Sequence, residues 1–378
     1  LETLMKIGLA GTGRIGAFHA KILVGLPEVD ELVLFDVVPE SAARVADEVG
    51  ATTVGSIEEL LASGIDGFVI TTGTHTHADL LKAAIAAGVP TFCEKPVAGD
   101  LEGSIELAQL AAQSDVPVHI GFQRRFDNGY RRLREAVQAG ELGFIHTIRA
   151  ATHDQSPPHA AYIPTSGGLF RDCSVHDFDI LRFVTGQEVK SVYAVGANKG
   201  DKFFTDGGDV DTAAAVLTME DDTLVVVTAT RYNGGGHDVR MEVHGSDGSL
   251  SVGLDDSYAF TSAEPGVTFP PGPQKWSFME RFEPAYRAEL TAFDPMRAPA
   301  ATLWPPSDRR LGLSAGGCAA SEPRQRAVDD LQTLGDLIRG DDRRRHDVQP
   351  VVGDEGEQTG LGQVTLEATH VGRRQGLA

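Results

Sequence analysis

The sequence predicts an α/β protein in which an N-terminal, doubly wound parallel sheet is followed by an α+β domain with a large open, mostly antiparallel sheet. Three observations lead to this prediction. Short apolar runs alternate with helical patterns in the first third of the chain, strand-forming runs dominate after Phe126, and 378 residues exceed the usual ~100–200 residues of one domain.

The N-terminal segment alternates predicted strands with predicted helices, which implies parallel strands covered by helices on both faces. The expected strands are Ile7–Ala10, Leu32–Phe35, Phe68–Thr71, Thr91–Cys93 and Val118–Ile120. The expected helices are Ile15–Leu26, Ser41–Val49, Ile57–Ser63, His77–Ala87 and Leu101–Ser114.

The second segment contains expected helices at Tyr130–Ala139, Val175–Thr185 and Trp276–Phe293, the last returning toward the first domain. Its β-rich runs have turn residues between them, as in an antiparallel sheet. The expected strands are Ile145–Thr152, Val192–Ala197, Thr212–Met219, Thr223–Arg231, Val239–His244 and Gly248–Val252. With helices on one face only, we expect the open face to be buried in a homodimer or homotetramer.

Composition and charge exclude several classes of protein. Asp and Glu number 54 against 33 Lys and Arg, so the net charge of −21 would repel nucleic acid. Apolar runs such as Phe68–Thr72 are too short to span a membrane, and no signal segment is evident, so we expect a cytoplasmic protein. Cys93, Cys173 and Cys318 lie far apart and indicate neither a disulfide framework nor a structural zinc site.

A glycine-rich turn lies between the first strand and the first helix. Its residues are Gly11, Thr12, Gly13, Arg14, Ile15 and Gly16. In this context the motif predicts a dinucleotide site, because the glycines allow a tight turn and a close approach of pyrophosphate to the helix N-terminus. The alternative is a structural glycine turn.

Asp36 ends the second predicted strand, about 20 residues after the turn, where a carboxylate accepts hydrogen bonds from the adenosine ribose. It would repel a 2′-phosphate, and the next three residues include no Arg or Lys. We therefore expect NAD rather than NADP as the cofactor. The alternative is that Asp36 only caps a helix or lies in solvent.

Lys95 follows the strand Thr91–Cys93 and so lies at the carboxyl edge of the parallel sheet, where ligands of such folds bind. A second candidate group is Asp172, His176 and Asp179, whose spacing stacks them on one helix face if the helix begins by Asp172. A His oriented by a carboxylate suits removal of a hydroxyl proton. The alternatives are a solvated Lys, a capping Asp and a core His.

No metal site is expected. His75 and His77 form a His-x-His pair in a predicted loop, and His153-Asp154 lies elsewhere in the chain. Neither forms a compact set of His, Cys and Asp ligands of the kind that zinc requires.

Together, five features resemble the Gfo/Idh/MocA oxidoreductase family. They are the Gly11–Gly16 turn, Asp36, Glu94-Lys95-Pro96, the run 121–127 and the run 172–179. The match extends from Met5 to about Phe293. The stretch from His153-Asp154 through Pro157-Pro158 to Asp179 is most similar to the inositol 2-dehydrogenase branch.

The resemblance implies roles for particular residues. Lys95, Asp172 and His176 would form the catalytic group, with Lys95 or His176 as base. Residues near the polyol would be Arg125, Asp154, Asp179 and Tyr232. Residues near the nicotinamide half of NAD would be Thr72, His77, Glu94, Lys95 and Gln123, and the bond before Pro96 would be cis.

The implied activity is NAD-dependent oxidation of a secondary hydroxyl of a cyclic polyol, first of all myo-inositol to its 2-keto inosose. The alternatives are another sugar or cyclitol dehydrogenase, a keto-sugar reductase, or a non-enzymatic NAD-binding protein. The implied domains are residues 5–122 for NAD and 123–293 for substrate and self-association.

The sequence departs from the family pattern in three places. Thr72-Gly73-Thr74 lacks the proline usual after the first threonine, and the run 231–238 is glycine-rich. Residues 294–378 contain no lysine and do not match the helix with which the family ends. We hypothesise a frameshift there, with a genuine extension as the alternative and with disorder expected beyond Arg339.

Overall fold

The structure is a computed structural model that describes residues 5–255, 258–267, 272–293 and 364–365. These residues divide into two compact units. Unit 1 contains residues 5–127 and 282–293, and unit 2 contains residues 128–281 and 364–365. The sequence predictions for the tail, including the frameshift, lie outside the described residues except at 364–365.

Unit 1 is a six-stranded parallel sheet in the order β3-β2-β1-β4-β5-β6. The chain order reverses between β1 and β4, which creates the switch point where doubly wound sheets bind ligands. The strands are β1 (Met5–Ala10), β2 (Val29–Phe35), β3 (Thr52–Thr53), β4 (Gly67–Ile70), β5 (Thr91–Glu94) and β6 (Val118–Gly121).

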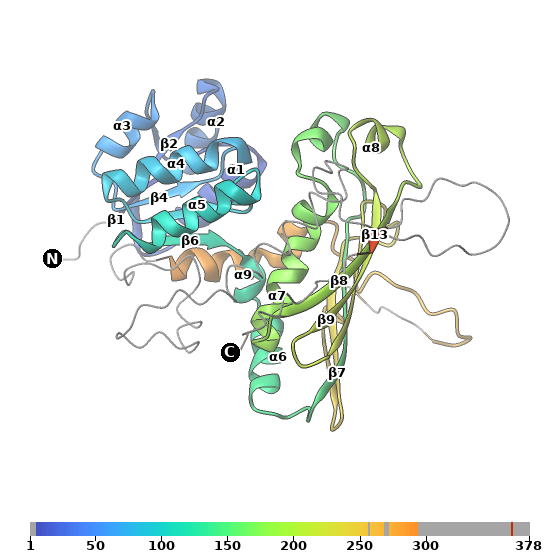
Figure 1. Cartoon of the computed structure of the whole chain (residues 1–378). Helices are drawn as coiled ribbons and strands as arrows, with labels where there is room; N and C mark the ends of the chain where they lie inside the picture. The colour runs from blue at the N-terminus through green and yellow to red at the C-terminus, as the bar shows by residue number, and fades with distance from the viewer. Residues whose placement is uncertain (1–4, 256–257, 268–271, 294–363, 366–378) are drawn as a thin grey trace, which may run out of the picture. The chain divides into compact units, whose positions relative to one another are not determined.

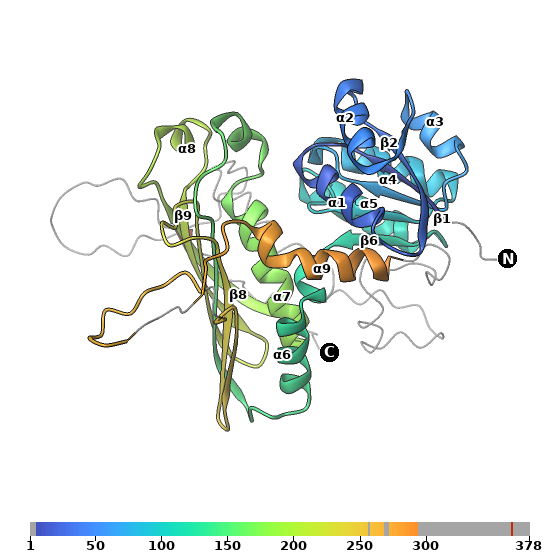
Figure 2. The ribbon, with the colours of Figure 1, turned by 180° about the vertical axis from the view of Figure 1, so that it is seen from behind.

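Helices cover both faces of this sheet, with α4 and α5 in front in Figure 1 and α1 and α2 in front in Figure 2. The central strand β4 is therefore apolar throughout, and every one of its residues is buried. The helices are α1 (Arg14–Leu23), α2 (Pro39–Val49), α3 (Ile57–Ala62), α4 (Thr74–Ala87) and α5 (Leu101–Ala112).

The second half of helix α9 (Phe278–Ala292) completes the core of unit 1. The ring of Tyr286 meets Phe18 and His19 edge-on, with centroids 5.4 and 5.5 Å away. Nearby, His119 stacks on Phe92. Burial, and then the charge of Arg125, lower the pKa of His119 to about 4, so its ring is neutral and packs as an aromatic group.

Unit 2 is built on a seven-stranded sheet in the order β12-β11-β7-β10-β9-β8-β13. Only the β7–β10 pair is parallel, so the sheet is mixed but mostly antiparallel. The strands are β7 (Ile145–His153), β8 (Val189–Ala197), β9 (Thr212–Met219), β10 (Leu224–Thr230), β11 (Asp238–Gly245), β12 (Ser249–Val252) and β13 (Val364–Thr365).

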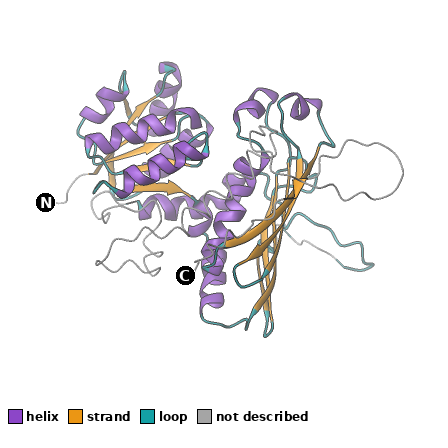
Figure 3. Ribbon diagram, viewed as in Figure 1, coloured by secondary structure: helices purple, strands orange, loops and turns teal. Residues whose placement is uncertain are grey.

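The two faces of this sheet differ in what covers them. Helices α6 (Asn128–Gln138) and α7 (Val175–Thr185) run along one face (Figure 3). Side chains on the opposite face include four large apolar ones that are 36–52% exposed. These four, here called the outer apolar patch, are Val195, Val216, Leu224 and Val226. In the described part of the chain, no helix covers this patch.

The predicted helices and strands are all present, with ends that differ by no more than three residues. The sequence predictions omitted β3, the short helix α8 (Lys202–Asp206), the 3₁₀ segments and a π-helical turn at Phe170–Ser174. These pieces are too short to show a periodic pattern. No helix in the described ranges is long and apolar enough to cross a membrane.

Candidate functional site

The glycine turn of unit 1 lies between β1 and α1, and its three glycines have different surroundings. Gly11 has a φ of +92°, and a Cβ there would lie 2.7 Å from the backbone of Thr71. A Cβ on Gly16 would lie 1.7 Å from the carbonyl oxygen of Gly11. The protein's own packing therefore requires Gly11 and Gly16.

Gly13 differs, because a Cβ there would have no protein atom within 4 Å and its φ is −66°. Neither backbone strain nor packing requires glycine at this position. Gly13 is also the N-cap of α1, and no side chain caps the helix. The N–H groups of the first turn, beginning at exposed Arg14 and half-buried Ile15, therefore suit an anionic ligand such as pyrophosphate.

Replacing Gly13 by alanine should separate cofactor binding from folding. We expect about hundredfold weaker NAD binding, a loss of about 3 kcal/mol, because the new methyl occupies space left for pyrophosphate. The melting temperature should change little. Gly16→Ala is the matched control, and it should destabilise the fold itself. NAD titration and thermal melting of both variants would measure this, and unchanged NAD affinity in Gly13→Ala would contradict it.

Asp36 holds the glycine turn in place from the end of β2. Its Oδ2 accepts hydrogen bonds from the Thr12 backbone N–H (2.6 Å) and the Thr12 hydroxyl (2.9 Å). Its Oδ1 accepts one from Val38 N–H at 2.9 Å. Burial raises the pKa of Asp36, but these hydrogen bonds outweigh it, and the pKa lies below its ordinary value. The carboxylate is therefore ionised, as recognition of ribose hydroxyls requires.

Two further loops meet at the carboxyl edge of the same sheet. His77 is buried, and its Nδ1 lies 2.8 Å from the carbonyl oxygen of Pro96 while its Nε2 lies 3.1 Å from that of Thr72. The imidazole thus ties the loop after β4 to the loop after β5. The Lys95–Pro96 bond is cis, as the resemblance implied. In this structure His77 supports the backbone around Lys95.

Glu94, at the end of β5, binds a buried histidine. Its Oε1 lies 2.6 Å from Nε2 of His19, which belongs to α1 and is fully buried. Gln123 and Arg125 follow β6 in a 3₁₀ turn, and both are buried, with the Arg125 guanidinium 5.9 Å from the centre of the Phe122 ring. All these candidate residues therefore cluster after strands β4, β5 and β6.

In unit 2, the Asp172 segment begins at two glycines that no other residue would replace easily. Gly167 and Gly168 have φ values of +88° and +90°. Oδ1 of Asp209 then accepts the N–H of Leu169 at 3.0 Å, which fixes the start of the helical path. A π-helical turn over Phe170–Ser174 leads into α7, and such turns occur often at functional sites.

Asp172 lies in this π-helical turn and contacts a phenol and a guanidinium. Its Oδ1 accepts the Tyr162 hydroxyl at 3.0 Å, and its Oδ2 lies 2.6 Å from Nη2 of Arg231. Burial, and then the charge of Asp172, raise the pKa of Tyr162 far above its usual range, so the phenol keeps its proton and donates a hydrogen bond to the carboxylate. Asp172 is therefore held as an acceptor.

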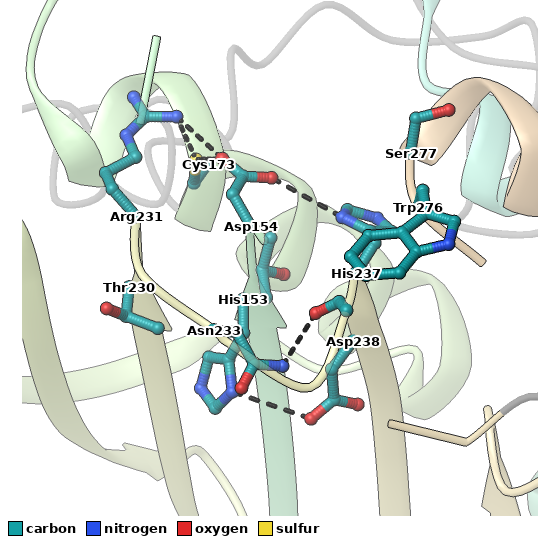
Figure 4. Close-up of polar contacts among 12 residues, drawn as sticks. His153, Asp154, Cys173, Thr230, Arg231, Asn233, His237, Asp238, Trp276 and Ser277 are labelled. Carbon is teal, nitrogen blue, oxygen red and sulfur yellow. Dashed lines mark hydrogen bonds and ion pairs between the residues drawn. The ribbon is translucent and has the colours of Figure 1, made fainter. Parts of the chain in front are cut away.

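Arg231 contacts both Asp172 and Asp154. Figure 4 shows its contacts with Asp154 and Cys173. Its Nη1 lies 3.0 Å from Oδ2 of Asp154 and 2.9 Å from the sulfur of Cys173, and its side chain is 4% exposed. On the other side of Asp154, Nδ1 of His237 lies 3.5 Å from Oδ1. Burial raises the pKa of Asp154, but His237 and Arg231 outweigh it, and the pKa falls below the ordinary value.

The other predicted residues of unit 2 lie at different places. His176 is half-buried on α7, and Asp179 is buried one turn further on. Tyr232 does not join the cluster around Arg231. Its hydroxyl instead lies 2.6 Å from Oδ2 of Asp201, beside α8.

Three residues around Asp154 and Asp172 were not predicted from the sequence. They are Arg231, Tyr162 and His237. Arg231 precedes the predicted Tyr232, and neighbouring residues of an extended chain point to opposite sides. An Arg in a strand run with no other charged residue was the available signal. Among the described residues, no group of three or more His, Cys, Asp or Glu is placed to hold a metal ion.

Comparisons with known proteins agree with this arrangement. Residues 5–122 match a family described as "Oxidoreductase family, NAD-binding Rossmann fold". Residues 130–251 match a family described as "GFO/IDH/MocA C-terminal domain". A myo-inositol dehydrogenase of Streptomyces leeuwenhoekii is 40% identical over 325 residues, covering 84% of this chain and 98% of that protein.

Solved structures give the same result. A myo-inositol dehydrogenase from Corynebacterium glutamicum matches with a TM-score of 0.73 and 29% identity, over 89% of this chain and 95% of that one. A scyllo-inositol dehydrogenase from Lactobacillus casei, solved with NAD(H) and scyllo-inositol, matches with a TM-score of 0.68 and 30% identity, over 77% of this chain and 88% of that one. This chain therefore belongs to the Gfo/Idh/MocA family of NAD-binding oxidoreductases.

Proposed function

We propose that the chain oxidises a secondary hydroxyl of a cyclic polyol with NAD, and that its first substrate is myo-inositol, which yields the 2-keto inosose. The observation that carries this proposal is the buried guanidinium of Arg231, which fixes the carboxylates of Asp154 and Asp172. The three relatives described above are each named as inositol dehydrogenases, which supports the same substrate class.

The charge of this cluster favours a neutral polyol over an acid. Two carboxylates and one guanidinium leave a net negative charge, and carboxylate oxygens accept hydrogen bonds from hydroxyl groups. The side chain of Asp154 is 22% exposed and that of Asp172 is 15% exposed, so both keep surface available to a ligand. A uronate or a sugar phosphate would be repelled.

The proposed reaction gives each candidate residue a role. Bound NAD would accept the hydride from the carbon that bears the reacting hydroxyl. Lys95 or His176 takes the hydroxyl proton as general base, while Asp172, held by Tyr162 and Arg231, orients the base and balances its charge. Asp154, Asp179 and Arg125 would bind the remaining hydroxyls. Residues that would line the nicotinamide half are Thr72, His77, Glu94 and Gln123.

We also propose that the protein is a homodimer or homotetramer and works in the cytoplasm. A second copy covering the outer apolar patch would remove exposed Val216 and Val226 from water. The described cysteines, Cys93 and Cys173, are free thiols, which suits a reducing compartment. Light scattering would test the first point, and a Val216→Lys variant should shift the mass toward the monomer.

A turnover panel tests the main proposal. The purified chain would be offered NAD or NADP with a set of inositols and aldoses, and formation of the reduced cofactor would be followed. We expect turnover of inositol with NAD and much less with NADP, because Asp36 repels a 2′-phosphate. Preference for aldoses, or for a keto-sugar with NADH, would favour a different member of the family. NAD binding without turnover of any polyol would favour a non-enzymatic role.

A further inference from the structure

His237 is a buried histidine beside the proposed substrate carboxylate. It lies between the turn Asn233–Gly236 and β11, and its backbone N–H donates to the carbonyl oxygen of Lys275 at 3.0 Å. The side chain is 2% exposed, and its ring edge meets Phe278. Neither ring nitrogen has a hydrogen-bond partner among the residues that the structure describes.

A buried polar group of this kind is costly. An unsatisfied buried donor or acceptor loses its hydrogen bonds to water without replacing them, so native proteins retain few such groups without a reason. The Nδ1 of His237 points toward Oδ1 of Asp154, but 3.5 Å is too long for a well-formed hydrogen bond (Figure 4). The two atoms therefore face each other but do not form a hydrogen bond.

The two oxygens of Asp154 have different surroundings. Oδ2 accepts from Arg231 and lies 3.7 Å from the thiol sulfur of Cys173. Oδ1 instead faces His237, whose Nδ1 is 3.5 Å away. A hydroxyl group donates one hydrogen bond and accepts others, so one hydroxyl oxygen can donate to Oδ1 and accept from Nδ1–H at the same time.

We propose that His237 is a specificity-determining residue that binds, together with Asp154, one hydroxyl of the polyol. The inference rests on the proposed function and deepens it. A ring carbon that lacks this hydroxyl leaves both a buried donor and a buried acceptor unsatisfied. The pair therefore selects substrates that carry a hydroxyl at that position, because sites built to bind a hydroxyl reject analogues without it.

Three substitutions distinguish this role from simple packing. His237→Phe keeps the aromatic ring beside Phe278 and removes both nitrogens. His237→Asn places an amide N–H near the position of Nδ1, whereas His237→Gln places one near Nε2. The matched control is His244→Phe in β11, the strand that begins directly after His237, because His244 binds Ser249 and Arg149 on the outer side of the sheet.

The full-length variants would be assayed with NAD on myo-inositol and on a set of its monodeoxy analogues. We expect His237→Phe to raise KM for myo-inositol about tenfold or more with little change in kcat or in NAD affinity. His237→Asn should recover most of the loss, whereas His237→Gln should not. The control His244→Phe should keep the KM of the wild type. For one monodeoxy analogue, the wild type and His237→Phe should have similar KM values, because that analogue lacks the hydroxyl that His237 binds.

The outcomes separate the two proposals. If the wild type turns over inositol but His237→Phe loses efficiency equally on every analogue, His237 only packs, and the inference is overturned while the proposed function stands. If the wild type turns over no polyol, the proposed function fails, and the inference fails with it. Should His237→Phe not fold, the comparison of the Asn and Gln variants decides, and equal KM values for the two would count against Nδ1.

Discussion

Replacing Lys95 by methionine should lower kcat for inositol oxidation by about a thousandfold or more while leaving NAD binding within a few-fold of wild type. Methionine keeps most of the volume of lysine but can neither donate nor accept the proton. His77 and the Pro96 carbonyl should still hold the surrounding backbone, since their contact does not involve the Lys95 side chain. Steady-state rates and NADH fluorescence titration would separate the two effects.

The histidine partner gives the second half of this test. His176→Asn should cost a comparable factor if His176 is the base, and a smaller one if Lys95 takes the proton, and the double variant should fall no further than the more severe single one. Lys95→Arg should not restore activity, because a guanidinium does not give up its proton near neutral pH. Turnover of the Lys95→Met enzyme within tenfold of wild type would remove Lys95 from the catalytic group.

The second large effect should follow from replacing Arg231 by methionine. Two half-buried carboxylates would then lose the buried guanidinium that balances their charge, and breaking such an ion network costs about 3–5 kcal/mol of folding free energy. Efficiency on the polyol should fall as well, since Asp154 and Asp172 would no longer be fixed. Denaturant unfolding and kcat/KM would both be measured, with Arg287→Met on the exposed surface of α9 as the matched control.

The destabilisation should depend on pH with a definite sign. In the wild type the pKa of Asp154 lies below its ordinary value of 3.8. Its contribution to stability is therefore complete above about pH 4 and is lost as the pH falls through the lowered folded value. In Arg231→Met the carboxylates protonate more readily. The difference in unfolding free energy between this variant and the wild type should therefore narrow as the pH is lowered from 7 toward 4. A gap that stays constant over this range would show that Arg231 acts through packing alone.

Rescue gives a sharper version of the same test. Adding Asp154→Asn and Asp172→Asn to Arg231→Met removes the unbalanced charges and should recover much of the stability but none of the activity. Recovery of both would show that the carboxylates have no role in turnover. This design separates a structural ion network from one that also binds substrate.

Much of the fold could be predicted from the sequence because its signals are local. Apolar runs of four to seven residues, helical spacing and turn glycines are properties of adjacent residues, and they located the strands and helices of both units. The glycine turn and Asp36 were also predictable, since the turn lies between β1 and α1 and Asp36 directly follows β2. Short pieces such as β3 were missed because two residues cannot show a period.

The substrate-side cluster depended on the tertiary structure. Arg231 is 59 residues from Asp172 and 77 from Asp154 in sequence, and no pattern in the chain indicates that one guanidinium bridges both. The pairing of β7, β10 and β11 also decided two other positions. Tyr232 turns toward Asp201, and His237 lies beside Asp154. The sequence by itself therefore determined the parallel and antiparallel sheets and the dinucleotide turn, whereas the partners of each buried charge were decided by strands that meet only in the folded chain.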